Sequence, residues 1–188
     1  MFALTSTRPA PEPPIPQGDR SNYKNCRAEP DDHALGRSRG GWTTKIHALV
    51  DGTCAPVALR LTAGQAGDNP ELAPLIESYR GLGKRGYRLL ADKAYSHPST
   101  RTMLRAKRIT HNIPERSDQI EHRKTKGSRG GRPSGFDPQI YRHRNTVERS
   151  FNRLKHWRGI PTRYDKYAVT YLGGVLLAAT ITTHRLGE

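Results

Sequence analysis

One stretch of the chain, YRHRNTVERSFNRLK at residues 141–155, surrounds a single carboxylate with cations and a phenol. It contains no Pro or Gly and is long enough for about four helical turns, so it predicts a helix. At about 100° per residue, four polar side chains share an arc of roughly 60°: Tyr141, Arg144, Glu148 and Lys155. A carboxylate held between cations is suited to a site that handles a metal ion and a phosphate.

The same helix has a simpler interpretation. An apolar stripe runs beside the polar arc and predicts a buried face, formed by Ile140, Val147, Phe151 and Leu154. Arg144 and Glu148 are four residues apart and could form an ordinary ion pair on the surface of an amphipathic helix. Taken alone, the helix favours this simpler interpretation over a functional site.

A second carboxylate follows a short apolar segment. YRLLA at residues 87–91 predicts a buried strand, and Asp92 comes directly after it. Open α/β sheets place ligand chemistry at the carboxyl ends of their strands, although an Asp in a surface loop has the same sequence appearance. Phosphodiester cleavage is helped by two divalent ions about 4 Å apart, and Mg²⁺ prefers carboxylate and water ligands. Asp92 and Glu148 are candidate ligands, and such a site would need a third carboxylate.

Composition indicates a polyanionic partner. The chain has 188 residues, enough for one domain, and its formal net charge of +15 favours nucleic acid. Residues 1–20 do not form a signal peptide, and the most apolar tract, 171–181, is too short to span a membrane. With only Cys26 and Cys54, neither a zinc site nor a disulfide framework is predicted, and the cytoplasm fits best.

Two basic segments are candidate phosphate contacts. GRSRGG at residues 36–41 presents Arg37 and Arg39, and the segment 115–135 contains HRKTKGSRGGR, which includes Lys124 and Lys126. Their simpler interpretations are a flexible entry to a strand and a solvated loop. The segment 115–135 is expected to be a basic loop because it has too little apolar content to fold alone.

The remaining patterns predict an α/β layered domain. Strands are expected at 42–50, 56–62, 87–91 and 109–113, with a hairpin turn at Asp51-Gly52. Helices are expected at 68–79, from about 98 to 107, at 141–155 and at 167–185. Residues 1–35 are rich in Pro and are expected to be poorly ordered, so the folded domain should span residues 36–185.

Several motifs resemble the DDE transposases of bacterial insertion sequences: GRSRGGWTTKIHALVDG, LTAGQAGDNPEL, LLADKAY and the spacing Tyr-x2-Arg-x3-Glu-x6-Lys. The resemblance covers about residues 32–179. It implies a ribonuclease-H-like fold, a mixed sheet with flanking helices, in which an Asp, Asp, Glu triad binds two magnesium ions. It also implies nicking of transposon ends by water and attack of the freed 3′-hydroxyl on target DNA. Asp92 and Glu148 match the second Asp and the Glu.

The resemblance fails at the first Asp, which in this family lies on the first, central strand. Here the region is LTST at residues 4–7, with Thr5 at the position of the Asp. We therefore expect the first strand to be missing or degenerate, metal binding to be weak, and independent transposition to be weak or absent. The change in composition near Asp32 also leads us to expect a truncated or second-frame product.

Double-stranded DNA, at transposon ends and in the target, is the implied partner, with possible self-association or association with an intact transposase. Two alternatives stay open. One is a non-catalytic basic DNA-binding remnant that competes for transposon ends or associates with intact transposase. The other, a ribosome-associated basic protein, would suit the charge but gives no reason for Glu148 within a cationic stripe.

Overall fold

The computed structural model describes residues 2–7, 33–79 and 87–184 of the chain. The strands are β1 (Phe2–Thr7), β2 (Gly36–Ser38), β3 (Gly41–Val50), β4 (Pro56–Ala63), β5 (Arg88–Ala91) and β6 (Thr110–Asn112). The helices are α1 (Leu72–Ser78), α2 (Pro98–Ala106), α3 (Ser117–Thr125), α4 (Pro138–Tyr141), α5 (Asn145–Lys155) and α6 (Ala168–His184). Short 3-10 turns join them: η2 (Asn69–Glu71), η3 (Lys93–Tyr95), η4 (Gly127–Gly130) and η5 (Arg142–Arg144).

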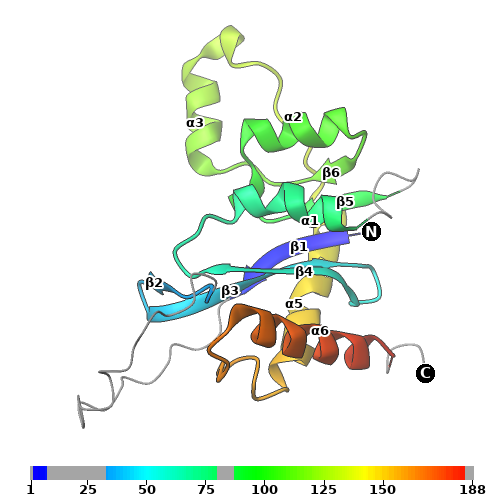
Figure 1. Cartoon of the computed structure of the whole chain (residues 1–188). Helices are drawn as coiled ribbons and strands as arrows, with labels where there is room; N and C mark the ends of the chain where they lie inside the picture. Colours follow the sequence, from blue (N-terminus) through cyan, green and yellow to red (C-terminus); the bar gives the residue numbers. More distant parts are fainter. Residues whose placement is uncertain (1, 8–32, 80–86, 185–188) are drawn as a thin grey trace.

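The sheet is mixed, as expected, and β1 lies at its centre (Figure 1). β1 pairs antiparallel with β3 and parallel with β5, while β4 continues the sheet from β3 and β6 from β5. Leu4 of β1 pairs with Leu49 of β3 and with Ala91 of β5. This arrangement, with helices on both faces, is compatible with the ribonuclease-H-like fold.

The first strand was expected to be missing or degenerate; it is present, so the first of these alternatives is wrong, and the second stays a prediction. Residues 2–7 form β1, although they belong to the segment 1–35 that was expected to be poorly ordered. The Pro run that motivated this expectation starts only at Pro9, and FALTST before it has no Pro or Gly. Without β1, the facing edges of β3 and β5 would leave backbone donors and acceptors unpaired in the middle of the sheet. Residues 8–32, which make up most of the expected N-terminal segment, lie outside the described residues.

Helices cover both faces of the sheet and create two cores. On one face, α5 and α6 pack over alternate β3 residues such as Ile46 and Ala48. On the other face, α1 and α2 pack over Leu49 of β3 and Leu89 of β5. This alternation along β3 is the two-residue period of a strand buried on both sides.

Most predicted elements are confirmed within a few residues. The hairpin turn between β3 and β4 is closed by Asp51, whose Oδ1 accepts hydrogen bonds from the Thr53 and Ala55 amides at 2.9 Å each. Asp68, at which the first helix was expected to begin, makes no side-chain cap hydrogen bond and pairs with Lys45 at 2.8 Å. The Lys45 side chain is almost fully buried and needs that carboxylate, so the helical segment begins with η2 rather than with a side-chain cap.

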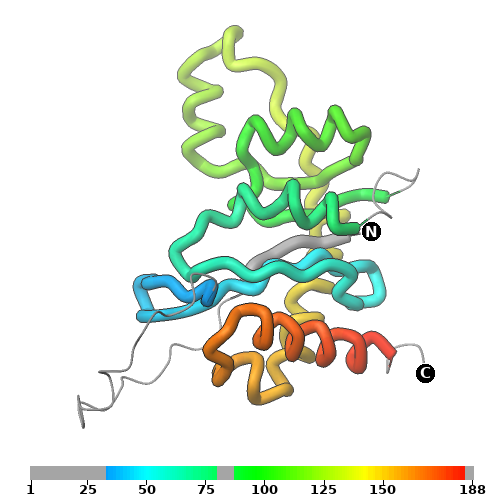
Figure 2. The backbone as a smooth tube through the Cα atoms, in the orientation of Figure 1, coloured from blue at the N-terminus to red at the C-terminus, as the bar shows by residue number. Residues whose placement is uncertain are grey.

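The segment 115–135 was expected to be a basic loop, but it is not a loop throughout. It contains α3 and η4, which with α2 form the end of the molecule opposite α6 (Figure 2). α3 begins with acidic Asp118 in its first turn and ends with three basic residues, which matches the helix dipole. Its packing relies on polar contacts, including an ion pair between Arg123 and Glu115, so low apolar content did not prevent folding.

The final helix, α6, is apolar on nearly every face. Val175 and Ala179 are buried, whereas Leu176 is 46% exposed. Within the described part of the chain, no helix is both long enough and apolar enough to cross a membrane.

Candidate functional site

The helix that carries the predicted Tyr, Arg, Glu and Lys set starts at Pro138 and is not uniform. It passes from α4 through the 3-10 turn η5 into α5. Asp137 caps its start, because its Oδ1 accepts hydrogen bonds from the Gln139 and Ile140 amides at 2.9 and 3.2 Å. On α5 the predicted apolar stripe is confirmed, since Val147, Phe151 and Leu154 are buried against the sheet.

A buried asparagine, Asn112, fixes this helix to the sheet. Its Nδ2 donates to the Asp137 carbonyl at 2.7 Å, and its Oδ1 accepts from the Asp137 amide at 3.0 Å. The pair imitates a strand-to-strand backbone pair and ties the end of β6 to the start of α4. Sequence reasoning placed a strand at 109–113 and a helix at 141–155 but did not connect them. The available signal was a polar residue near the end of an apolar strand.

Tyr141 directly precedes η5, the turn that packs against β5, and both candidate carboxylates act on its phenol. Burial raises the pKa of its phenol, the Asp92 and Glu148 carboxylates raise it further, and Arg144 acts in the opposite direction. The phenol is therefore protonated at neutral pH. Because both carboxylates act on this one phenol, Asp92 on the β5 side and Glu148 on α5 belong to one electrostatic cluster.

An ion pair orders the helical side of this cluster. Arg144 Nη2 lies 2.6 Å from Glu148 Oε1, and the guanidinium carbon lies 5.7 Å from the centre of the Tyr141 ring. Phe136 meets the same ring edge-on at 5.2 Å. The Glu148 side chain is 54% exposed, whereas that of Arg144 is 20% exposed. An incoming phosphate can therefore reach the pair from solvent, and the exposed ion pair itself contributes at most about 1 kcal/mol.

Asp92 stands at the carboxyl end of β5, directly after Ala91. Its Oδ1 accepts the Lys93 amide at 2.5 Å and caps η3. Leu4 and Ala91 pair across the parallel strands β1 and β5, so Thr5 and Asp92 are the next residues along each strand. The position matched to the missing first Asp is therefore next to Asp92 in the sheet.

Within residues 2–7, 33–79 and 87–184, the available donors do not fit a pair of magnesium ions. Among the described residues, no group of three or more His, Cys, Asp or Glu side chains is placed to hold a metal ion. Asp92 and Glu148 supply two carboxylates, one of which is paired with Arg144. Two divalent ions need more negative charge than this, and position 5 holds Thr where a third carboxylate would be needed.

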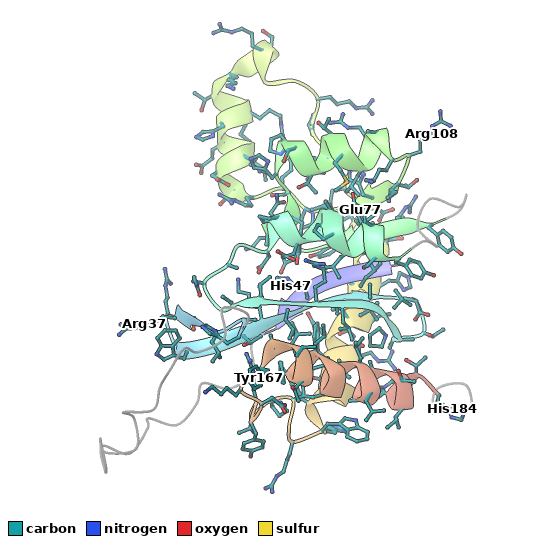
Figure 3. All side chains as sticks on the ribbon, in the orientation of Figure 1. Arg37, His47, Glu77, Arg108, Tyr167 and His184 are labelled. Carbon is teal, nitrogen blue, oxygen red and sulfur yellow. The ribbon has the colours of Figure 1, made fainter. Side chains whose placement is uncertain are left out.

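The other predicted residues are more dispersed. Lys155 is exposed in the last turn of α5, on the same helix as Glu148. Arg37 lies on β2 and points outward from the end of the β2–β3 hairpin, separated from β5 by β3 and β1 (Figure 3). Arg39 is exposed in the turn of that hairpin. The structure therefore does not bring Arg37 and Arg39 together with Asp92.

Lys124 and Lys126 are two residues apart in sequence, but they lie in different surroundings. Both are exposed near the end of α3. Lys126 lines a groove between α2 and α3, and Lys124 is not among the residues that line it.

Comparisons with known proteins agree with the motifs. A family described as "Transposase DDE domain" matches residues 13–182. A Brucella ovis protein named "Putative transposase for insertion sequence element IS6501" is 32% identical over 139 residues, which cover 74% of this chain and 96% of that protein. No solved structure was found to match the chain.

Proposed function

The chain belongs to the transposase DDE domain family, and from this premise we propose that it binds insertion-sequence DNA with a phosphodiester at the Asp92–Glu148 cluster. As an isolated chain it cleaves and transfers DNA strands weakly or not at all. The observation that carries this proposal is the packing of η5, which begins after Tyr141 and includes Arg144, against β5, the strand that Asp92 follows.

The cationic and phenolic groups of the cluster suit a phosphate. The protonated phenol of Tyr141 can donate a hydrogen bond to a non-bridging oxygen. Arg144 presents a planar guanidinium beside it and can exchange its contact with Glu148 for a bidentate contact with phosphate. Lys155 on the same helix would add a point charge toward the flanking DNA.

The number of carboxylates in the cluster limits the strand cleavage that we expect from this chain. Members of the family with a complete triad bring two magnesium ions to the scissile phosphate, but the two carboxylates here cannot neutralise that charge. We therefore derive no cleavage step through metal ions. The expected consequence is weak Mg²⁺ binding and a strong loss of strand cleavage compared with a complete triad.

The same observations favour a second function, that of a non-catalytic DNA-binding remnant. A chain that binds transposon ends without cutting them would compete with an intact transposase, or associate with it or with itself. The Arg144–Glu148 ion pair supports this alternative, because it occupies one of the two carboxylates before any DNA is bound.

Magnesium-dependent nicking separates the two functions. Purified chain would be incubated with supercoiled plasmid carrying a cognate insertion-sequence end, with Mg²⁺ and with EDTA. Nicking that disappears in Asp92→Asn and in Glu148→Gln supports residual transposase chemistry. DNA binding that persists in both variants, without nicking by any of the three proteins, supports the remnant. A chain that does not bind DNA at low salt contradicts both.

A further inference from the structure

A groove lined mainly by cations lies between α2 and α3, and neither Tyr141 nor Glu148 is among its lining residues. It has a volume of about 520 Å³. Its basic residues are Arg101, Arg105, His122, Arg123, Lys126 and Arg132. Glu115 is the acidic residue in its lining.

Most of this positive charge is not neutralised within the described residues. Arg123 Nη1 is 2.5 Å from each carboxylate oxygen of Glu115, so that pair is balanced. The other groove cations take part in none of the ion pairs found among the described residues: Arg101, Arg105, Lys126 and Arg132. A concave surface with several unbalanced cations concentrates anions.

Hydrogen bonds to backbone carbonyl groups fix the side chains of two arginines on α2, Arg101 and Arg105. Arg101 Nη2 donates to the Ile113 carbonyl at 2.9 Å, and Arg105 Nε donates to the Arg101 carbonyl at 3.1 Å. Arg101 and Arg105 are four residues apart on one helix face, where like charges repel. Each guanidinium keeps further N–H groups for an outside acceptor, so an anion in the groove would relieve the repulsion and use these donors.

The opposite wall of the groove is fixed as well. Gln119 Nε2 of α3 donates to the Ser96 carbonyl at 3.1 Å, which ties α3 to the segment before α2. η4 folds back on α3 so closely that a Cβ on Gly130 would clash with the Arg123 carbonyl oxygen. The groove is therefore built from fixed elements, and little ordering is needed for a ligand to bind.

The groove also begins close to the candidate site. Ser96, in its lining, ends the 3-10 turn η3, and Asp92 begins that same turn. We propose that the α2–α3 groove binds the phosphodiester backbone of DNA whose neighbouring phosphate lies at the Asp92–Glu148 cluster. This inference rests on the proposed function and adds a second, sequence-independent contact surface to it.

Two triple variants with equal reduction of charge test the groove. The first is Arg105→Gln, Lys126→Gln and Arg132→Gln, all of which line the groove. The second replaces three exposed cations from the same region that do not line it: Lys107→Gln, Arg108→Gln and Arg129→Gln. Arg108 points outward from the end of α2 (Figure 3). Far-UV circular dichroism and thermal melting would establish that both triples are folded.

The readout is the affinity for a 30-base-pair duplex of arbitrary sequence, measured from about 50 to 200 mM salt. Each phosphate that the protein no longer neutralises should reduce the slope of log affinity against log salt by about 0.9, so the groove triple should show a slope smaller by about 2 to 3. The slope of the control triple should fall by less than about 1. Equal slopes for the two triples would contradict DNA binding in the groove but would not affect the proposed function. A wild-type chain that does not bind DNA would contradict both proposals.

An acidic peptide is the alternative occupant, and the same proteins test it. Poly-glutamate is titrated against the wild type and both triples. If its affinity drops only in the groove triple while DNA affinity is equal in the two triples, the groove binds an acidic peptide and our inference is wrong. If DNA and poly-glutamate compete for the wild type and both weaken in the groove triple alone, the inference is supported.

Discussion

Thr5 of β1 and Asp92, the residue directly after β5, each lie one step beyond the Leu4–Ala91 pair that joins these two parallel strands. A residue at position 5 is thus at the right level in the sheet to share a ligand with Asp92. The chain has a central strand at residues 2–7, and the sequence resemblance aligns Thr5 of this strand with the first Asp of the family.

Thr5→Asp should therefore strengthen metal binding. A third carboxylate beside Asp92 adds the negative charge that two divalent ions need, and we expect Mn²⁺ affinity by calorimetry to rise about tenfold, about 1.4 kcal/mol. Magnesium-dependent plasmid nicking should appear or increase. Thr5→Asn is the control, since it has nearly the shape of Asp without its charge. Equal Mn²⁺ affinity in the Asp and Asn variants would show that position 5 is not part of the site.

Removing the cations of the α5 polar arc should weaken DNA binding more than removing a cation elsewhere on the helix. We expect Arg144→Ala and Lys155→Ala each to lower duplex affinity about fivefold to tenfold, as when a charge-assisted hydrogen bond is removed. Arg149→Ala is the control because Arg149 is exposed on the same helix but outside the arc. Fluorescence anisotropy at one fixed salt concentration measures all three. Equal reductions would mean that general charge, not the arc, makes the contact.

The periodic parts of the fold could be predicted from the sequence. β3, β5 and the apolar stripe of α5 follow from local alternation or from a 3.6-residue period, and their burial agrees with it. β1 could not be placed from FALTST alone, because a six-residue segment next to a Pro run gains its order from β3 and β5 on either side. α3 was missed for a similar reason, since its stability depends on Glu115 and Ser96 outside the helix.

The residue types of the candidate site could be predicted from the sequence, but the contacts that hold these residues in place could not. The spacing from Tyr141 to Lys155 and the position of Asp92 after an apolar strand both follow from the sequence. The clamp between Asn112 and Asp137 depends on two elements meeting in space, which no local pattern specifies. The α2–α3 groove likewise needs a folded α3, so a stretch expected to be a loop could only be described as basic.

A buried arginine, Arg163, should contribute strongly to stability. It is 5% exposed, and it donates to the His33 carbonyl at 2.6 Å, to the Asp165 carbonyl at 3.0 Å and to the Thr44 hydroxyl. Arg163→Met should lower the free energy of unfolding by about 3 kcal/mol, because buried carbonyls lose their donors. Urea denaturation measures this change. Arg158→Met, at an exposed position of the same loop, should change stability by less than about 0.5 kcal/mol. Similar changes in the two variants would contradict the anchoring role.

Buried His47 should make the fold less stable in mild acid. It is fully buried and its Nε2 lies 2.7 Å from the Thr62 hydroxyl. Burial lowers its pKa, with nearby Lys45 and Arg60 acting in the same direction and Asp68 and Glu71 opposing them.

The sign of the effect follows from the protons bound. Below the unfolded pKa of about 6.5 the unfolded chain binds a proton that folded His47 does not, so the free energy of unfolding falls as pH drops through 6.5 toward the lower folded pKa. Burial also lowers the pKa of His111, so both histidines should contribute. Urea denaturation between about pH 7.5 and 5 should show a shallower decline for His47→Gln than for the wild type. Parallel curves for the two proteins would mean that His47 does not couple folding to protonation.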